Sequence, residues 1–495
     1  MDLKRRTLDG LAWIFLARLV NQVVQYGISV VVARVLMPDD FGLVAMVGAV
    51  TGVAAIFLDL GIGAAIIQRR DLTEEQTRTA FFATSALGLL LCLLTVAAAP
   101  LVASFYGRSD LVTITRVMAL TFVFNAAGVV PRSLLQRDLR LRRSALNDVL
   151  SGGCGAIVNL VLALRGFQVW SLVVSSIVSG IVGATLAWIA AGRLRPSTHL
   201  ASIKPLLHVS FNLLAFNFVN YWARAADNLI IGKLLGEHEL GIYTRAYSLM
   251  MLAISQIAAS VSGGMVPALA QAQGDQPRLQ RMYLRAVSMT AFVAFPLMVG
   301  LSASADAFMR TIYGQKWVDA IPILRLLALV GALQAFLNPV GWIFVSQGRT
   351  DRMLRIGLIT APVIVVGFFV GATFRSAYAV AWSYVITNLL ICIPEMKVAG
   401  ACIGLSVRTM LSALKKTALS AAIMGGLVWA VGWLTQGLPD AVRLAAQVVT
   451  GAITFFGLAT ILKDPALLDA KEIFGERWTR LKSKVSGRRE AAPTG

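Results

Sequence analysis

About fourteen apolar stretches follow one another along the chain. Each contains the roughly 20 residues that a helix needs to cross a hydrocarbon core about 30 Å thick. They begin near residues 10, 41, 79, 111, 145, 169, 208, 240, 282, 320, 353, 376, 411 and 440. The first stretch has the basic start of a signal peptide, but it continues to Leu36 without a small-residue cleavage site. The pattern predicts an all-α polytopic membrane protein with about fourteen transmembrane helices.

The basic residues lie in the connections between these stretches. Of the 495 residues, 57% are hydrophobic and 14% are charged, and the net charge is +20. A nucleic-acid-binding protein needs a basic face on a soluble fold, whereas Lys and Arg here occupy short gaps between apolar stretches. We therefore attribute the charge to membrane topology and expect no nucleic-acid partner.

Alternate connections differ sharply in basic residues. One set contains, among others, Arg69, Arg70, Arg78, Arg132, Arg137, Arg140, Arg142, Arg143, Arg278, Arg281 and Arg285. The opposite set contains little beyond Arg108, Arg165, Arg310, Lys316, Arg375 and Arg443. Arginine-rich connections face the cytoplasm, so we expect a multi-pass protein with both termini cytoplasmic.

Two of the apolar stretches carry the same stripe of polar side chains at a constant offset of 199 residues. The first stripe is Arg18, Asn21, Gln22, Gln25 and Ser29, and the second is Asn217, Asn220, Tyr221, Arg224 and Asn228. Spacings of 3, 4 and 7 residues place each set on one helical face. An arginine in hydrocarbon costs about 2.5 to 3.5 kcal/mol or more, so we expect the stripes to line a shared aqueous cavity.

The same offset extends past the stripes. Residues 31–43 (VVARVLMPDDFGL) align without gaps to residues 230–242 (IIGKLLGEHELGI), with Gly42 opposite Gly241. A six-helix period is even, so both copies enter the membrane in one direction and are related by an axis along the membrane normal. We expect a six-helix lobe at residues 1–200, a second at 201–400, and two further helices at 401–463.

Residues 464–495 form a tail of a different kind. Apolar residues recur near helical spacing, and Lys and Arg fill other positions: Leu467, Phe474, Trp478, Leu481 and Val485 against Lys471, Arg477, Arg480, Lys482 and Lys484. This pattern predicts a basic amphipathic helix lying on the inner leaflet. A solvated helix that anchors the end of the last membrane helix is the alternative.

The sequence contains few signatures of catalysis. The cysteines and histidines show no metal-ligand spacing: Cys92, Cys154, Cys392, Cys402, His199, His208 and His238. No GxxxxGK[ST] loop occurs, so the chain does not hydrolyse ATP by that route. We expect no catalytic residue, no metal, no cofactor and no enzyme activity.

Residues 7–50 and the following LDLGIGAAIIQRR at residues 58–70 carry a specific resemblance. Their sharpest part is Ala33 to Leu43, ARVLMPDDFGL. This segment resembles the N-terminal signature of the Wzx-type polysaccharide flippases of the multidrug/oligosaccharidyl-lipid/polysaccharide (MOP) exporter superfamily. As a pattern, the resemblance covers nearly the whole chain.

The resemblance implies a V-shaped, two-lobed transporter with fourteen helices. Such proteins move undecaprenyl-diphosphate-linked oligosaccharide repeat units across the bacterial inner membrane for exopolysaccharide, capsule or O-antigen synthesis. The implied partners are that lipid-linked substrate, membrane lipids, and the polysaccharide polymerase and chain-length machinery. The lobes would rock about a cavity between helices 1, 2, 7 and 8 in alternating access.

Candidate site residues follow from the stripes. We expect the substrate cavity to be lined by Arg18, Asn21, Gln22, Gln25, Asn217, Asn220, Tyr221, Arg224 and Asn228. Asp59 and Asp227 are candidates for ion coupling or for counter-ions, with Arg18 and Arg224 as their expected pairing partners. A second tier comprises Tyr243, Arg245, Tyr247, Arg325 and Asn338, most of which we expect to be structural.

Two other functions stay open at this point. A cation-coupled multidrug exporter of the same superfamily predicts a cavity rich in carboxylates and aromatic rings, whereas these stripes contain amides and arginines. A membrane polysaccharide polymerase or ligase predicts catalytic residues on a sizeable outer loop domain, and the outer connections here are short.

Overall fold

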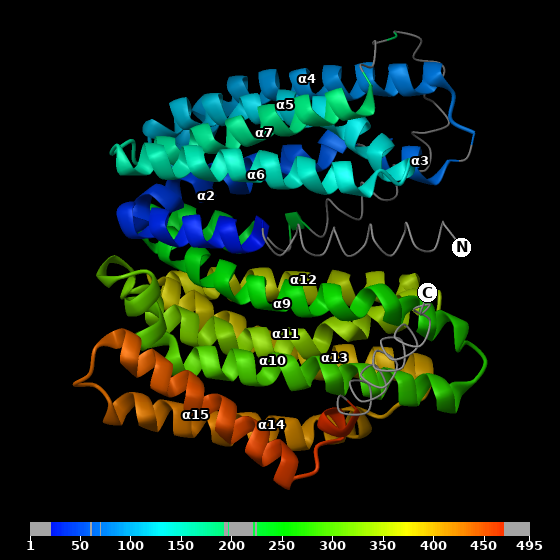
Figure 1. The fold of residues 1–495 in the computed structure, drawn as a ribbon, viewed down its shortest axis with the longest axis vertical. Helices are drawn as coiled ribbons and strands as arrows, with labels where there is room; N and C mark the ends of the chain where they lie inside the picture. The colour runs from blue at the N-terminus through cyan, green and yellow to red at the C-terminus, as the bar shows by residue number, and fades with distance from the viewer. Residues whose placement is uncertain are drawn as a thin grey trace, which may run out of the picture. The chain divides into compact units, whose positions relative to one another are not determined.

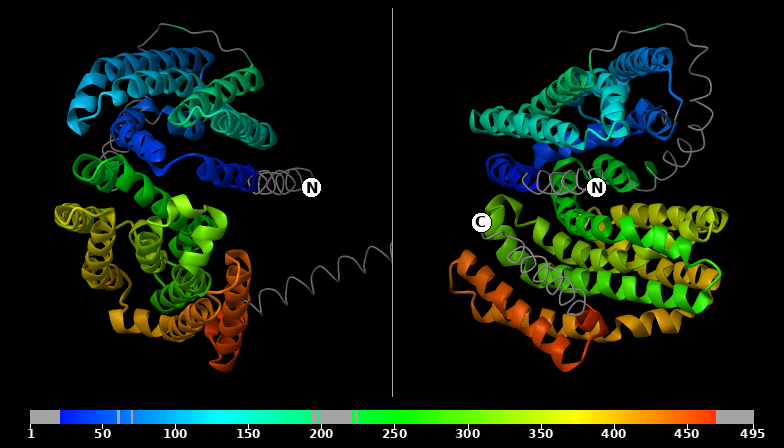
Figure 2. Two further views of the ribbon diagram at one scale, coloured as in Figure 1. Left: turned by 90° about the vertical axis from the view of Figure 1, so that its left-hand side faces the viewer. Right: turned by 45° about the vertical axis from the view of Figure 1, so that its right-hand side comes forward.

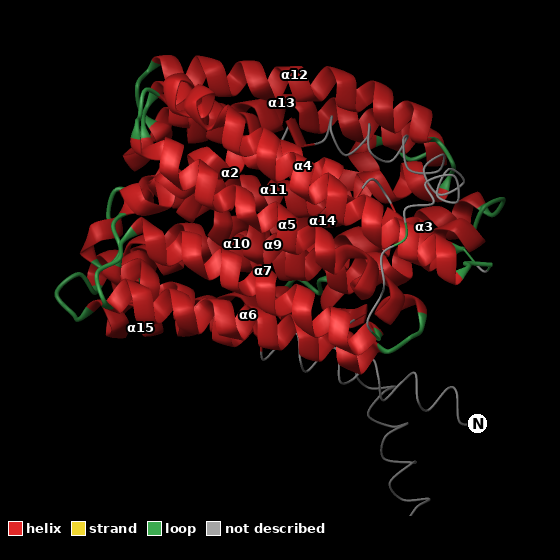
Figure 3. Ribbon diagram, turned by 90° about the horizontal axis from the view of Figure 1, so that it is seen from above, coloured by secondary structure: helices red, strands yellow, loops and turns green. Residues whose placement is uncertain are grey.

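The computed structural model describes residues 21–59, 62–69, 71–192, 197, 221–222 and 225–469. Within these residues every regular element is a helix and no strand occurs (Figure 3). Eleven of the helices are long and apolar enough to cross a membrane. The all-α polytopic prediction is therefore confirmed. The count of fourteen is not: the stretches expected near residues 10 and 208 fall largely outside the described residues, and the helix at the stretch expected near residue 240, Glu237–Gln271, is not among the eleven.

The chain packs into two compact units. Unit 1 contains residues 1–244 and 372–380, and unit 2 contains residues 245–371 and 381–495. The boundary falls inside one long helix, α9 (Glu237–Gln271), whose first eight residues belong to unit 1. The domain bounds expected from the duplication stay a prediction.

Unit 1 is a bundle of helices that begins with residues 21–35. It continues with α2 (Pro38–Asp59), α3 (Ile62–Gln68), α4 (Glu74–Tyr106), α5 (Asp110–Arg137), α6 (Leu141–Leu164) and α7 (Val169–Ala191), and later includes residues 225–234. Figure 1 shows α5 lying between α4 and α7, and both helices contact it along their length. The core between α2, α4 and α5 contains Leu58, Leu91 and Phe122.

Local sequence signals explain where α4 begins and ends. The Thr73 hydroxyl accepts a hydrogen bond from the Gln76 backbone amide at 3.1 Å, and the Gln76 side chain accepts one from the Thr73 amide at 3.2 Å. This capping box satisfies two of the amides that a helix start leaves without partners. Gly107 then ends the helix with a left-handed φ of 74°, a conformation that glycine adopts without a steric penalty.

Unit 2 is built around α10 (Gln276–Ile312). The remaining helices are the rest of α9, α11 (Ala320–Ser346), α14 (Val407–Leu434) and α15 (Asp440–Ile461), with a short 3₁₀ turn, η2 (Gln315–Trp317). Unit 2 also contains α12 (Thr350–Thr373) up to residue 371 and α13 (Ala377–Ile403) from residue 381. Helix α10 contacts α11, α14 and α15, and both views in Figure 2 show the orange-red α15 lying against its neighbour α14. Tyr283, Phe336 and Met396 belong to the core cluster on one side of α10.

Candidate functional site

The described part of the first polar stripe faces helix α6. Gln25 Nε2 donates a hydrogen bond to Asn21 Oδ1 one turn earlier, at 3.3 Å. Both side chains lie against Gly152: a Cβ there would overlap the Gln25 amide nitrogen and would lie 3.3 Å from Asn21 Oδ1. Asn21 and Gln22 are half-buried, whereas Gln25 is exposed. The side-chain amides of Asn21 and Gln25 therefore lie next to each other on the helix face that meets α6. Gly152 has no side chain and leaves space for them.

The second stripe is represented by Tyr221, which docks on α2. Its hydroxyl donates to the backbone carbonyls of Ala49 at 2.9 Å and of Gly48 at 3.2 Å. The tyrosine ring fills the space that a Cβ on Gly52 would need. Carbonyl oxygens inside a helix retain a second lone pair, so α2 accepts these bonds without giving up its own.

Asp227 is buried and is bound by its neighbours. Its carboxylate accepts hydrogen bonds from the Tyr243 hydroxyl at 3.2 Å and from the Asn228 backbone amide at 2.7 Å. Asp227 is 2% exposed and Tyr243 is fully buried. Burying a carboxylate costs several kcal/mol unless hydrogen bonds compensate, and two donors supply part of that compensation. The structure thus brings together Asp227, a candidate for ion coupling, and Tyr243, a residue of the second tier. The side chain of Asn228 is half-buried.

The other second-tier residues lie in unit 2. The Arg245 guanidinium lies 4.8 Å from the centroid of the Tyr313 ring and 5.8 Å from that of Trp317, and the two rings meet edge to face. This stacking holds the charge on aromatic surfaces. Tyr247 is half-buried, and Arg325 and Asn338 are exposed.

Several predicted residues cannot be placed. Arg18, Asn217, Asn220 and Arg224 lie outside the described residues, as does the side chain of Asp59. The expected pairing of Arg18 with Asp59, and of Arg224 with Asp227, stays a prediction.

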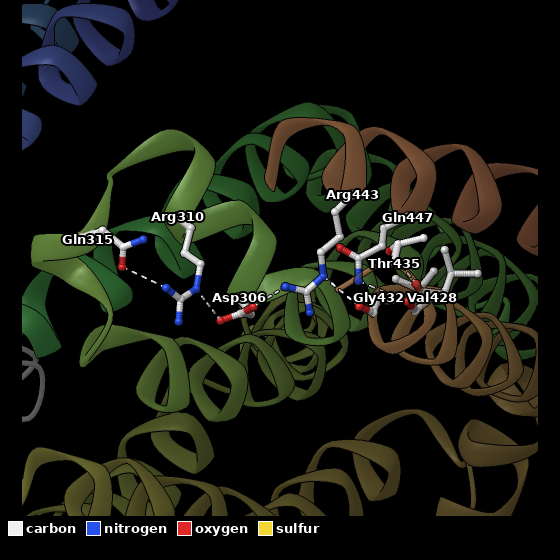
Figure 4. A network of polar contacts seen from close by, with 9 residues as sticks. Asp306, Arg310, Gln315, Val428, Gly432, Thr435, Arg443 and Gln447 are labelled. Atoms are coloured by element: carbon white, nitrogen blue, oxygen red, sulfur yellow. Dashed lines mark hydrogen bonds and ion pairs between the residues drawn. The ribbon is translucent and has the colours of Figure 1, made fainter. Parts of the chain in front are cut away.

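A polar network in unit 2 was not predicted from the sequence (Figure 4). Asp306 on α10 accepts a hydrogen bond from Arg310 Nε at 3.0 Å and another from Arg443 Nη1 on α15 at 2.5 Å. Arg443 Nε also donates to the Gly432 carbonyl on α14 at 2.8 Å. Asp306 and Arg443 together therefore connect α10, α14 and α15. The four-residue spacing of Asp306 and Arg310 is the pattern that could have predicted their ion pair. The sequence analysis instead assigns Arg310 and Arg443 to the connections between helices.

Arg132 is a second residue that the sequence analysis treated as a loop charge. It lies inside α5, half-buried, with its guanidinium where a Cβ on Gly183 of α7 would otherwise lie. Ser151 of α6 approaches the same point. The Arg132 Nε is buried and has no hydrogen-bond partner among the described residues.

Unit 2 also contains an apolar cavity of about 700 Å³. It lies among α9, α10, α14 and α15, and its lining includes Phe292, Leu297, Met424, Val448 and Phe455. Among the described residues, no three His, Cys, Asp or Glu side chains lie together in a way that could hold a metal ion.

Comparison with known proteins matches residues 31–322 to the family described as "Polysaccharide biosynthesis protein". The teichuronic acid biosynthesis protein TuaB of Bacillus subtilis is 28% identical over 82% of this chain and 85% of its own length. The lipopolysaccharide biosynthesis protein WzxC of Escherichia coli is 24% identical over 79% of this chain and 80% of its own.

Among solved structures, the lipid II flippase MurJ in an inward closed conformation shares the fold. Its TM-score is 0.75 at 13% identity, and the match covers 91% of this chain and 98% of that protein. The transporter fold implied by the resemblance is therefore confirmed. Because the family match spans more than half of the sequence, the chain belongs to the polysaccharide biosynthesis protein family, as the segment from Ala33 to Leu43 indicated.

Proposed function

We propose that this protein moves a lipid-linked oligosaccharide from the cytoplasmic to the outer leaflet of a bacterial inner membrane, for the synthesis of a surface or secreted polysaccharide. The observation that carries the proposal is membership of the polysaccharide biosynthesis family combined with the fold of a lipid II flippase. The cargo is amphiphilic, so only its headgroup has to leave water.

The polar side chains of unit 1 suit such a headgroup. A diphosphate and sugar hydroxyls lose their hydration on entering the membrane, and amide or hydroxyl groups can replace it. Asn21, Gln25 and Asn228 supply amides on the two duplicated helices. Arg18 and Arg224 are proposed to add the positive charge that a diphosphate requires.

The lipid tail has a different requirement. A polyprenyl chain needs an apolar surface, and the cavity of about 700 Å³ in unit 2 offers one lined by Phe292, Leu297 and Met424. Burial of apolar area there contributes about 25 cal/mol per Å². Headgroup and tail would thus be bound by different surfaces of the chain.

No covalent step belongs to this proposal. Transport would proceed by alternating access, with net movement driven by a proton or sodium gradient at Asp227 and Asp59 or by consumption of the cargo outside. The partners would be the lipid-linked substrate, membrane lipids, and the polymerase and chain-length machinery. Both termini would lie in the cytoplasm.

The test uses a strain that lacks this protein. An impermeant sugar-modifying enzyme added to spheroplasts reports the leaflet in which complete lipid-linked repeat units lie. We expect missing polymer, with the repeat units trapped inside and released by re-expression of the full chain. Repeat units exposed outside but unpolymerised would instead indicate a polymerase, and an unchanged polysaccharide would indicate an exporter of other compounds.

A further inference from the structure

Arg132 extends into the bundle of unit 1 and away from the nearer end of its helix. It lies close to Arg137, the last residue of α5, about 8 Å away along the axis at 1.5 Å per residue. A long basic side chain so near a helix end usually extends toward the membrane surface and water. Here Cζ and Nε of Arg132 lie 3.6 Å from the position that a Cβ on Gly128 would occupy, one turn back along α5. The guanidinium therefore lies deeper in the membrane than its own Cα.

Two glycines leave the space that this side chain needs. Gly128 lies beneath it on α5, and a Cβ on Gly183 of α7 would overlap Arg132 Nη2. The Ser151 hydroxyl oxygen of α6 lies 3.5 Å from the position of the same Cβ. Figure 1 shows α7 lying between α5 and α6, and it contacts both. The guanidinium is thus held where three helices meet, in a space that a larger residue at position 183 would fill.

The charge of Arg132 has no counter-ion in the described part of the chain. Arg132 forms no ion pair and no hydrogen bond there, and its Nε is shielded from solvent. A guanidinium at membrane depth is costly unless an anion or hydrogen-bond acceptors compensate for lost hydration. An anion that these residues do not supply would provide that compensation.

A second polar group without a partner lies on the same side of α6. Asn147 precedes Ser151 by one helical turn and therefore shares its face. The Asn147 side chain is 4% exposed, and its Oδ1 has no hydrogen-bond partner among the described residues. An amide group presents either its oxygen or its NH₂ group, depending on what it meets. Asn147 and the Ser151 hydroxyl are therefore two neutral donors on the face of α6 that approaches the guanidinium.

The first polar stripe reaches the next residue of α6. Gly152 follows Ser151, and the side chains of Asn21 and Gln25 lie against it. Arg132 and the amides of the stripe thus approach one turn of α6 from different sides. A ligand with one anionic group and several hydroxyls would find the charge and the amides within the same part of unit 1.

We infer that Arg132 binds a phosphate-type oxyanion inside unit 1, with Ser151 and Asn147 as neutral donors. The inference rests on the proposed function, in which this oxyanion is the diphosphate of the lipid-linked oligosaccharide. A guanidinium suits it because two parallel N–H groups meet two oxygens of one phosphate. The arginine-rich connections assign this end of α5 to the cytoplasmic side, so the site lies where the cargo enters.

The test measures binding of radiolabelled inorganic diphosphate to the purified full chain in detergent, at constant ionic strength. Arg132→Gln removes the charge and keeps a polar side chain. Arg116→Gln is the matched control, because it changes an exposed arginine of the same helix. We expect the dissociation constant to rise at least tenfold with Arg132→Gln and less than twofold with Arg116→Gln. Equal dissociation constants for the unchanged chain and Arg132→Gln would overturn the inference.

A second variant moves the guanidinium without removing any charge, and it serves if Arg132→Gln does not fold. Gly183→Ala places a Cβ where Arg132 Nη2 lies, whereas a Cβ on Gly153 of α6 meets no atom within 4 Å. We expect diphosphate binding to weaken at least threefold with Gly183→Ala and to stay unchanged with Gly153→Ala. Unchanged binding by Gly183→Ala would contradict the placement of the anion at this guanidinium.

Two competitors distinguish the sources of the phosphate group. We expect a short-chain polyprenyl diphosphate to displace inorganic diphosphate, and phosphatidylglycerol at the same concentration to leave it bound. Displacement by phosphatidylglycerol alone would overturn the assignment to the cargo and indicate a site for membrane lipid.

This binding assay requires no transport, so it separates the inference from the proposed function. A chain that binds diphosphate through Arg132 but does not move the oligosaccharide would refute the proposed function and retain the anion site. A chain whose Arg132→Gln variant both binds diphosphate and moves the oligosaccharide as before would refute the anion site and retain the proposed function.

Discussion

Two aspartates, one in each unit, are stabilised in different ways. Asp306 in unit 2 is partly exposed and accepts hydrogen bonds from two guanidinium groups, Arg310 and Arg443. Asp227 in unit 1 is more deeply buried, and it accepts hydrogen bonds from a hydroxyl and a backbone amide. A carboxylate neutralised by two cations between helices is a structural brace. A buried carboxylate that accepts hydrogen bonds from a hydroxyl and a backbone amide is instead a candidate for exchanging a proton or for meeting a charged cargo.

The largest expected effect is a loss of stability when the ion pairs of Asp306 are removed. Asp306→Ala removes the carboxylate bound to Nη1 of Arg443, whose side chain is 13% exposed, and leaves the guanidinium only the Gly432 carbonyl. Breaking a buried pair in this way costs 3 to 5 kcal/mol, and partial exposure lowers our expectation to about 2 to 4 kcal/mol. Thermal unfolding in detergent, followed by tryptophan fluorescence, measures the loss.

The matched control for the brace is Asp110→Ala, which removes an exposed carboxylate 3.2 Å from Arg108. Such pairs contribute at most about 1 kcal/mol. Equal destabilisation by the two variants would remove the distinction between a structural brace and an ordinary surface pair.

For Asp227→Asn we expect the reverse of Asp306→Ala: transport is lost and stability is nearly unchanged. The amide oxygen still accepts a hydrogen bond from Tyr243, so we expect the unfolding temperature to change little, while transport falls at least tenfold. Asp306→Asn should keep its transport rate per folded molecule. The measurement is the rate at which purified variants, reconstituted in equal amounts, move the lipid-linked oligosaccharide across the membrane. Full transport by Asp227→Asn would show that Asp227, like Asp306, has only a structural role.

Tyr243→Phe sharpens the same comparison with a smaller change. It removes the hydroxyl that donates to Asp227 at 3.2 Å and leaves the buried carboxylate with fewer donors. We expect a loss of about 1 to 2 kcal/mol in unfolding free energy, because a buried group left without a bond loses its compensation for desolvation. No measurable change in thermal unfolding would show that this bond contributes nothing to the folded state.

Tyr221→Phe should have the smallest effect. The two carbonyls that accept from the Tyr221 hydroxyl keep their helical hydrogen bonds within α2, so little is left unsatisfied. We expect about 0.5 to 1 kcal/mol in the same unfolding assay. A loss as large as that of Asp306→Ala would show that docking of Tyr221 on α2 is a main support of unit 1.

The sequence predicted the fold better than the contacts of the polar residues. Long apolar stretches identify membrane helices because hydrocarbon thickness sets their length, and eleven of them appear as expected. The duplication identified Gly42 and Gly241 as equivalent positions. It did not reveal that His238 Nδ1 lies 2.7 Å from Asp39 Oδ1, because equivalence of two segments says nothing about the distance between them.

Pairing of charges was less predictable. Asp227 is expected to pair with Arg224 on its own helix, which stays a prediction, and the structure shows it bound to Tyr243 of the following helix. Arg310 and Arg443 were treated as loop charges, although they meet at Asp306. Helical periodicity places a side chain on a face, but the packing of other helices decides which groups that face meets.

The most direct test of the central claim is flipping by the purified chain alone. Vesicles containing the protein in known orientation are loaded with a fluorescent, short-chain polyprenyl-diphosphate oligosaccharide in the inner leaflet. An impermeant sugar-modifying enzyme outside then reports its arrival. We predict protein-dependent exposure of the sugar that is at least tenfold slower with Asp227→Asn and unchanged with Asp110→Ala. Exposure no faster than in protein-free vesicles, with the protein folded and correctly inserted, would contradict the account.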